Sequence, residues 1–125
     1  MAQPEQTRKS VYQGLRADYD AAFARLRREE SWLQSMAQLP SADKAVEDLA
    51  RRRVDEAMAT YRECRNKLTG FLASLQPGGK AAASADAHLA EVRALAYHLS
   101  EEVGRPLSNP DEQWYRAERL LRDAR

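Results

Sequence analysis

The sequence predicts an all-α protein in which a long antiparallel helical hairpin precedes a shorter one. Apolar residues recur in alternating steps of three and four along residues 5–75 of the 125, and glycine and proline number only five each. Arginine, alanine, glutamate and leucine dominate the composition, as in long helices. Alternating steps of three and four are typical of coiled-coil helices, so we expect a coiled-coil-like hairpin over 5–75.

The first helix is expected over residues 4–38. Its apolar seam consists of Tyr12, Leu15, Tyr19, Ala22, Leu26, Leu33 and Met36, with Glu29 in one slot. Gly14 costs roughly 1 kcal/mol of helix propensity, which weakens the first turns. Pro40 disfavours helix in the residue before it and ends the segment.

A second helix is expected from about Ala42 to Leu75. Ser41 is a suitable N-cap, and Asp43 lies where an acid in the first turn favours the helix dipole. The seam of this helix is Ala50, Val54, Ala57, Tyr61, Cys64, Leu68, Phe71 and Leu75.

The short turn near residue 40 predicts that the two helices fold back as an antiparallel hairpin about 50 Å long. The numbers of facing residues should therefore add to about 80. The facing pairs are then Leu26 with Val54, Tyr19 with Tyr61, and Leu15 with Cys64. Glu29 falls opposite Arg51, where either a register-setting ion pair or a Glu29 turned towards water is consistent with the sequence.

Bulky apolar residues flank the seam and widen the apolar face of the hairpin. They are Val11, Phe23, Trp32, Val46, Met58 and Leu72. A face this wide needs a further partner, either the C-terminal helices or a second copy of the chain. The candidate interaction face is Phe23, Trp32, Met58 and Leu72.

Residues 76–85 are rich in glycine and alanine and predict a linker. Ser84 with Asp86 then predicts an N-cap and a first-turn acid for a third helix that runs to about Val103. The apolar face of this helix is Leu89, Val92, Ala96, Leu99 and Val103.

Gly104 ends the third helix, and a complete helix start follows it. Asn109 is the expected N-cap, Pro110 stands at the first helical position and Glu112 at the third. The fourth helix runs to about Asp123 with Trp114, Ala117 and Leu121 facing inwards. Residues 86–124 are therefore expected to form a small hairpin shaped like a helix–turn–helix.

Residues 91–121 carry a combined pattern. It consists of Arg93, Ala96-Tyr97, Glu101, Gly104-Arg105-Pro106, Trp114, Arg116-Ala117-Glu118 and Leu121. This pattern resembles a small bacterial family of helical hairpins, the domain of unknown function 2934 family. The family has no established activity, so the resemblance implies a hairpin and no chemistry. Ser100 stands where that family often has tryptophan, and residues 1–76 show no resemblance.

Several residues are expected to anchor the small hairpin. They are Arg93, Tyr97, Gly104, Pro106, Trp114 and Glu118. Trp114 is expected to pack across the hairpin against Tyr97 or Leu99. Glu118 is expected to accept a hydrogen bond from Arg93 or Arg105.

Candidate chemical groups do not form a recognisable catalytic set. His88 and His98 belong to no Glu-x-x-His or His-x-x-x-His motif, although Glu91, His98 and Glu102 share a helix face. Cys64 lies on the seam, where a buried small hydrophobe is favoured over a nucleophile. Residues 77–80, Pro-Gly-Gly-Lys, lack the spacing of a phosphate-binding loop. We expect neither an enzyme nor a cofactor or metal.

Arginines gather at two places in the long hairpin. The expected fold brings residues 25–28 and 51–53 to the same end, where Arg25, Arg28, Arg51 and Arg52 form a candidate anion patch. Acids follow both clusters, which favours a salt-bridged surface. Arg116, Arg119 and Arg122 at steps of three fit a recognition helix or matching of the C-terminal helix dipole.

These patterns favour a protein–protein interaction or scaffold module that acts by burying helix faces, as a homodimer or with another helical protein. The alternative is a nucleic-acid-associated regulatory protein that uses the clustered arginines. A net charge of +1 does not favour that alternative. No apolar run approaches the ~20 residues of a membrane span, and the first residues lack a signal peptide's apolar core. With a single cysteine, we expect a cytoplasmic protein.

Overall fold

The computed structural model describes residues 4–39, 43–75, 86–103 and 110–124. Within these ranges the chain forms no strand and four helices: α1 (Pro4–Ala37), α2 (Lys44–Leu75), α4 (Ala87–Val103) and α5 (Pro110–Asp123). The all-α class is confirmed, with two long helices followed by two shorter ones. The chain divides into two compact units, residues 1–71 and 72–125. The expected linker 76–85, the caps Ser41, Ser84 and Asn109, and the turn residues Gly104 and Pro106 lie outside the described ranges.

Aspartates begin two of the helices. The Ala45 amide donates to Asp43 Oδ1 at 3.1 Å, and the Leu89 amide donates to Asp86 Oδ1 at 3.1 Å. Each aspartate therefore satisfies one of the amides that a helix start leaves without a partner. Asp43 and Asp86 are therefore N-caps, which corrects the prediction that they are first-turn acids. Helix α2 begins at Lys44 and not at residue 42 as predicted.

The end of α1 tightens before residue 40. The amides of Gln38 and Leu39 donate to carbonyls three residues earlier, those of Ser35 and Met36, at 3.3 and 3.2 Å. Such short-range bonds are usual where an α-helix ends. The helix therefore stops where Pro40 predicts.

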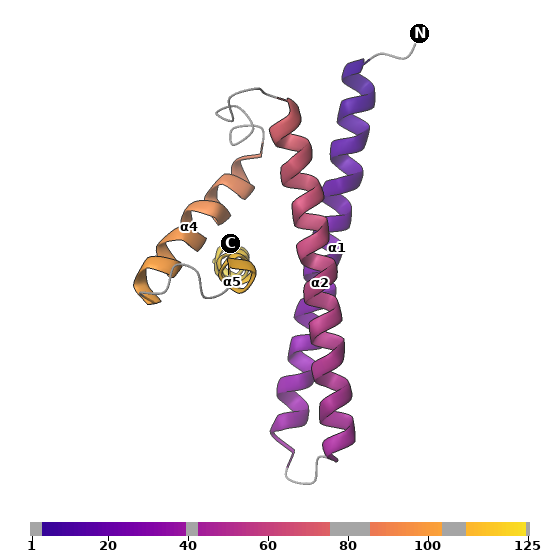
Figure 1. Cartoon of the computed structure of the whole chain (residues 1–125), viewed down its shortest axis with the longest axis vertical. Helices are drawn as coiled ribbons and strands as arrows, with labels where there is room; N and C mark the ends of the chain where they lie inside the picture. Colours follow the sequence, from indigo (N-terminus) through magenta and orange to yellow (C-terminus); the bar gives the residue numbers. More distant parts are fainter. Residues whose placement is uncertain (1–3, 40–42, 76–85, 104–109, 125) are drawn as a thin grey trace. The chain divides into compact units, whose positions relative to one another are not determined.

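Helices α1 and α2 lie side by side and antiparallel, as Figure 1 shows. The rings of Tyr19 and Tyr61 stack with centroids 5.3 Å apart, and their hydroxyl oxygens are 3.0 Å apart in a hydrogen bond. Both side chains are fully buried. The predicted facing of Tyr19 and Tyr61 is therefore confirmed. Other buried residues of the hairpin are Ala22, Phe23, Leu26, Ala50, Ala57 and Leu68.

The acidic interruption of the seam forms an ion pair, but with a different arginine from the one expected. Arg53 Nη2 lies 2.9 Å from Glu29 Oε1, and the Arg53 guanidinium lies over the Trp32 ring at 5.2 Å. Arg51 instead pairs with Glu47 of its own helix at 3.1 Å. The prediction of Arg51 is wrong because two residues turn a helix through about 200°. Arg51 and Arg53 therefore lie on opposite flanks of the seam.

Helices α4 and α5 pack on each other around a small core. Val92, Leu99 and Ala117 form its buried centre, and Leu95, Ala96, Trp114 and Leu121 surround them. Trp114 thus packs against the cluster that contains Leu99, one of its two expected partners. Tyr97 is 65% exposed and lies outside this core.

Among the described helices, none combines the length and the apolar character that crossing a bilayer requires.

Replacement of Arg53 and replacement of Arg51 should lower the free energy of unfolding by different amounts. We expect Arg53→Ala to lower the free energy of unfolding by about 1 kcal/mol, because it removes both the Glu29 ion pair and the contact with Trp32. Arg51→Ala loses only an exposed pair within one helix, worth about 0.3–0.5 kcal/mol. Urea unfolding of the single variants and of each combined with Glu29→Gln measures the coupling. Coupling of Glu29 to Arg51 and not to Arg53 would contradict the structure.

Candidate binding surface

The interaction face expected from the sequence is not an open surface. Phe23 and Leu72 are each only 4% exposed, and the Phe23 ring packs at 6.2 Å from that of Tyr61. Each of the two follows a fully buried residue, Tyr19 or Leu68, by four positions, so it shares the buried ridge of its helix. Trp32 and Met58, the other two expected members, are partly buried. Two of the four candidate residues are therefore buried and two are partly buried, and an interaction face formed by them stays a prediction.

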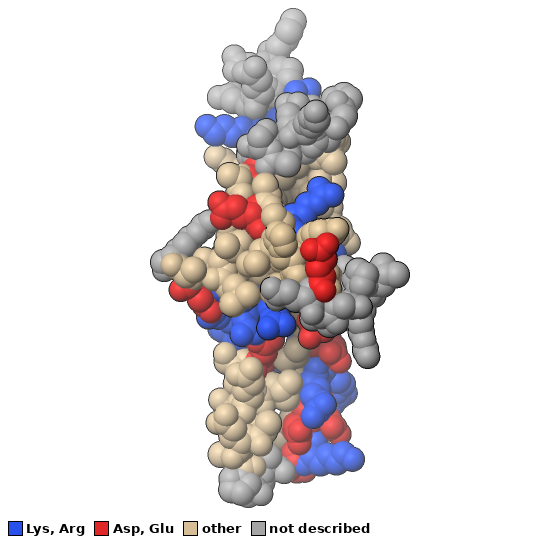
Figure 2. Space-filling view, turned by 90° about the vertical axis from the view of Figure 1, so that its left-hand side faces the viewer, with Lys and Arg blue, Asp and Glu red and all other residues tan. Residues whose placement is uncertain are grey.

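The arginine clusters lie among acidic side chains. Figure 2 shows basic and acidic residues intermixed in one column at the lower end of the view, beside a column without charges. Residues 31–39 contain no charged side chain, whereas residues 47–56 contain seven. Of the arginines, Arg51 pairs with Glu47 and Arg53 with Glu29. Arg28 and Arg52 are exposed and Arg25 is partly buried, so binding of an anion by Arg25, Arg28, Arg51 and Arg52 stays a prediction.

The arginines of α5 do not form a row of side chains that all point freely into solvent. Arg119 lies over the Tyr115 ring at 5.7 Å, and Arg122 Nε donates to Glu118 Oε1 at 2.6 Å. Arg116 is exposed. Two of the three arginines that fit a recognition helix therefore contact side chains of α5 itself.

A buried carboxylate closes the C-terminal hairpin. Glu118 of α5 is fully buried, and its Oε1 contacts both His88 Nε2, from the first turn of α4, and Arg122 Nε, one turn later in α5. The side chains of His88 and Arg122 are 10% and 28% exposed. A buried carboxylate is tolerated only when charged and hydrogen-bonding partners compensate for its lost hydration. The contact therefore ties the beginning of α4 to the second half of α5.

The described partners of Glu118, His88 and Arg122, do not include Arg93, and the alternative partner Arg105 stays a prediction. Arg93 is exposed and makes no described contact with Glu118, and Arg105 lies outside the described residues. The expectation of Arg93 is wrong because α4 and α5 cross each other (Figure 1), and Glu118 meets the first turn of α4 at His88 and not the middle of that helix. The sequence did contain a signal: Glu118 follows Trp114 by four residues and precedes Leu121 by three, so it stands on the apolar face.

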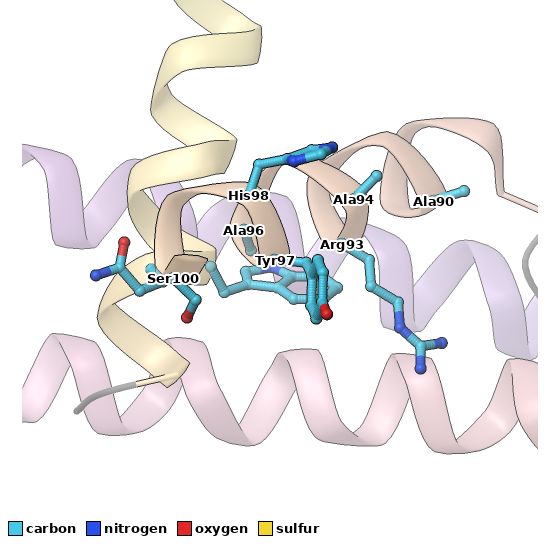
Figure 3. A pocket seen from close by; sticks show the side chains of 9 residues that line it. Ala90, Arg93, Ala94, Ala96, Tyr97, His98 and Ser100 are labelled. Carbon is cyan, nitrogen blue, oxygen red and sulfur yellow. The ribbon is translucent and has the colours of Figure 1, made fainter. Parts of the chain in front are cut away.

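A second feature of this hairpin is an open hollow of about 570 Å³ beside α4 and the start of α5. Its lining consists of Ala90, Arg93, Ala94, Ala96, Tyr97, His98, Ser100, Gln113 and Trp114. Figure 3 shows Arg93 and Tyr97 projecting to one side of α4 and His98 to the other. The hollow combines two aromatic rings, small alanines and a few polar groups, which is the usual make-up of a binding site.

One polar atom of the lining is buried without a hydrogen-bond partner among the described residues: Gln113 Oε1. A buried acceptor without a donor costs about 1–3 kcal/mol. The hollow therefore presents an acceptor that a bound molecule with an N–H or O–H group would satisfy.

The remaining candidates for chemistry are separate from one another. His98 is exposed, and its Nδ1 lies 4.0 Å from Glu101 Oε2. Within the described ranges no three His, Cys, Asp or Glu side chains come together as metal ligands do. Cys64 is a free thiol that is partly buried, which corrects the expectation of a buried core residue. Burial raises the pKa of the Cys64 thiol, the charge of Asp18 raises it further, Lys67 lowers it and Glu63 raises it.

These observations define the C-terminal unit as a short two-helix hairpin closed by a buried carboxylate and bearing an open aromatic hollow. Residues 88–123 match the model of the family described as Protein of unknown function (DUF2934). The match begins at His88 and ends at Asp123, so it includes both ends of the Glu118 contact and confirms the resemblance found in the sequence. Neither a curated protein nor a solved structure matches the chain.

Removal of the buried carboxylate should loosen the C-terminal hairpin. We expect Glu118→Ala to destabilise it by about 3 kcal/mol, because the Arg122 guanidinium then loses its carboxylate partner and the nearly buried His88 Nε2 loses its contact. Hydrogen exchange should accelerate in α4 and α5 and remain unchanged in α1 and α2. Arg116→Ala, an exposed change in the same helix, is the matched control. Equal protection of α4 in the two variants would contradict this role.

The raised pKa of Cys64 predicts slow alkylation. At a given pH a raised pKa leaves less thiolate, which is the reacting form. We expect Asp18→Asn to lower the Cys64 pKa and to shift the pH profile of iodoacetamide alkylation towards lower pH. Asp55→Asn, more than two turns away along α2, should leave the profile unchanged. A profile that is identical in wild type and Asp18→Asn would rule out the influence of Asp18.

Proposed function

We propose that this protein is a protein–protein interaction module, a scaffold or adaptor that acts by burying helix faces and not by catalysing a reaction. The binding surface is the hollow of the C-terminal hairpin together with the exposed face of α4. The observation that carries this proposal is Tyr97, a large aromatic residue 65% exposed at the edge of that hollow.

Single exposed apolar residues are common on protein surfaces and need no explanation. Tyr97 differs because it stands beside a concave, aromatic-walled surface that also contains Trp114. Tyrosine and tryptophan are enriched at interfaces because each buries a large apolar area and retains a polar group for hydrogen bonding. A protein partner that covers this surface would remove both rings from water.

The buried acceptor in the hollow supports the same role. None of the described residues donates a hydrogen bond to Gln113 Oε1, so a bound group or water could supply the donor. The lining also provides an Arg93 guanidinium at the rim and a Ser100 hydroxyl. In a helix-binding groove, a few polar groups within an apolar surface fix the orientation of the bound helix. A helical partner that offers an apolar side chain and a hydrogen-bond donor fits this arrangement.

A photo-crosslinking amino acid placed at position 97 tests the proposal in the cells that produce the protein. We expect a discrete crosslinked product from position 97. The same amino acid at Ala17, an exposed position in the middle of α1, is the control. No product at position 97, or an identical set of products at positions 17 and 97, would refute a binding surface at the hollow.

A further inference from the structure

We propose that the partner of this surface is a second copy of the chain, bound through α4 in an antiparallel arrangement with Tyr97 at the two-fold axis. This inference rests on the proposed function and names its partner. The observation behind it is the order of the exposed side chains along α4.

Three exposed residues follow one ridge of α4 at steps of four: Arg93, Tyr97 and Glu101. Side chains four residues apart lie one above the other on the same helix face. Along this ridge a positive charge (Arg93), an aromatic ring (Tyr97) and a negative charge (Glu101) follow one another. The two charges are equally far from Tyr97. When two such helices pair antiparallel about Tyr97, Arg93 of each copy meets Glu101 of the other.

The charge pattern is self-complementary in this arrangement alone. Parallel pairing would place Arg93 on Arg93 and Glu101 on Glu101, which like charges disfavour. A uniformly acidic partner would suit Arg93 but would oppose Glu101. A two-fold interface uses the same patch on both subunits, so a self-complementary patch is what it requires. Both charged side chains are on the surface: Arg93 is exposed, and the side chain of Glu101 is 56% exposed.

The shape of the face fits close helix packing. Ala90 and Ala94 of α4 also line the hollow. Small residues at these positions let a second helix approach closely, and the Tyr97 ring of each copy can then enter the hollow of the other. The entering ring brings a hydroxyl donor to a surface where Gln113 Oε1 lacks one among the described residues.

The contact between the two copies is small, which limits the affinity of the dimer. From residue 90 to residue 101 the face is about 17 Å long at 1.5 Å per residue. Such a face buries less than the roughly 800 Å² per partner of a standard interface. We therefore expect a weak, reversible dimer with a dissociation constant in the micromolar range.

Sedimentation equilibrium of the full chain over a concentration series tests the inference through charge reversal. Arg93→Glu places two glutamates opposite each other, and Glu101→Arg places two arginines opposite each other. We expect each single reversal to weaken the dimer about tenfold or more, and the double reversal, which restores opposite charges, to recover most of the affinity. Arg116→Glu, an exposed reversal on α5, should leave the affinity unchanged. Circular dichroism confirms that each variant keeps its helix content.

A strict monomer at all concentrations would overturn the self-pairing. So would a dimer that Arg93→Glu and Arg116→Glu weaken equally, or one that the double reversal does not recover. These results are distinguishable from failure of the proposed function. A monomer whose position 97 still crosslinks to a different protein refutes the second copy and leaves the interaction surface in place, whereas a monomer without crosslinks refutes both.

Discussion

Each hairpin contains a buried polar contact that forms in only one alignment of its two helices. In the long hairpin it is the stacked and hydrogen-bonded pair Tyr19 and Tyr61. In the short hairpin it is Glu118 with His88 and Arg122. Leucine and alanine seams tolerate a shift of one heptad, because apolar side chains have no directional partners. A buried hydroxyl or carboxylate that loses its partner costs free energy, so these contacts select the register.

The carboxylate contact has a direct consequence for the binding surface. It holds the first turn of α4 against the later turns of α5, and the small core of Val92, Leu99 and Ala117 fills the space between the two helices. This arrangement leaves the opposite face of α4, with Tyr97, in solvent. Trp114 stands one turn before Glu118 and is therefore positioned at the edge of the hollow by the same contact. A core this small depends on such anchoring, since apolar burial alone stabilises short hairpins weakly.

Several surface charges are paired with a charge one turn away in the same helix. Arg16 with Asp20, Arg51 with Glu47 and Lys67 with Glu63 are pairs one turn apart, at 3.4, 3.1 and 3.2 Å. Each stabilises little by itself in water. The Arg51–Glu47 pair also reduces the field of the arginine cluster at residues 51–53, because opposite charges a few ångströms apart cancel at a distance. The ridge of α4 is different in kind, because Arg93 and Glu101 lie two turns apart on either side of an exposed aromatic ring.

The sequence by itself determined the helices, the ends of most of them and the facing of Tyr19 and Tyr61. These features depend on periodicity, on proline and capping residues and on a short turn, all of which are local. Only the tertiary structure decided that Arg53 and not Arg51 meets Glu29, that Phe23 and Leu72 are buried, and that Glu118 contacts His88. Those outcomes depend on how far each helix is rotated about its axis and how wide the packed seam is. Neither quantity is set by spacing along one helix, because both follow from the combined shapes of the side chains that two helices place between them.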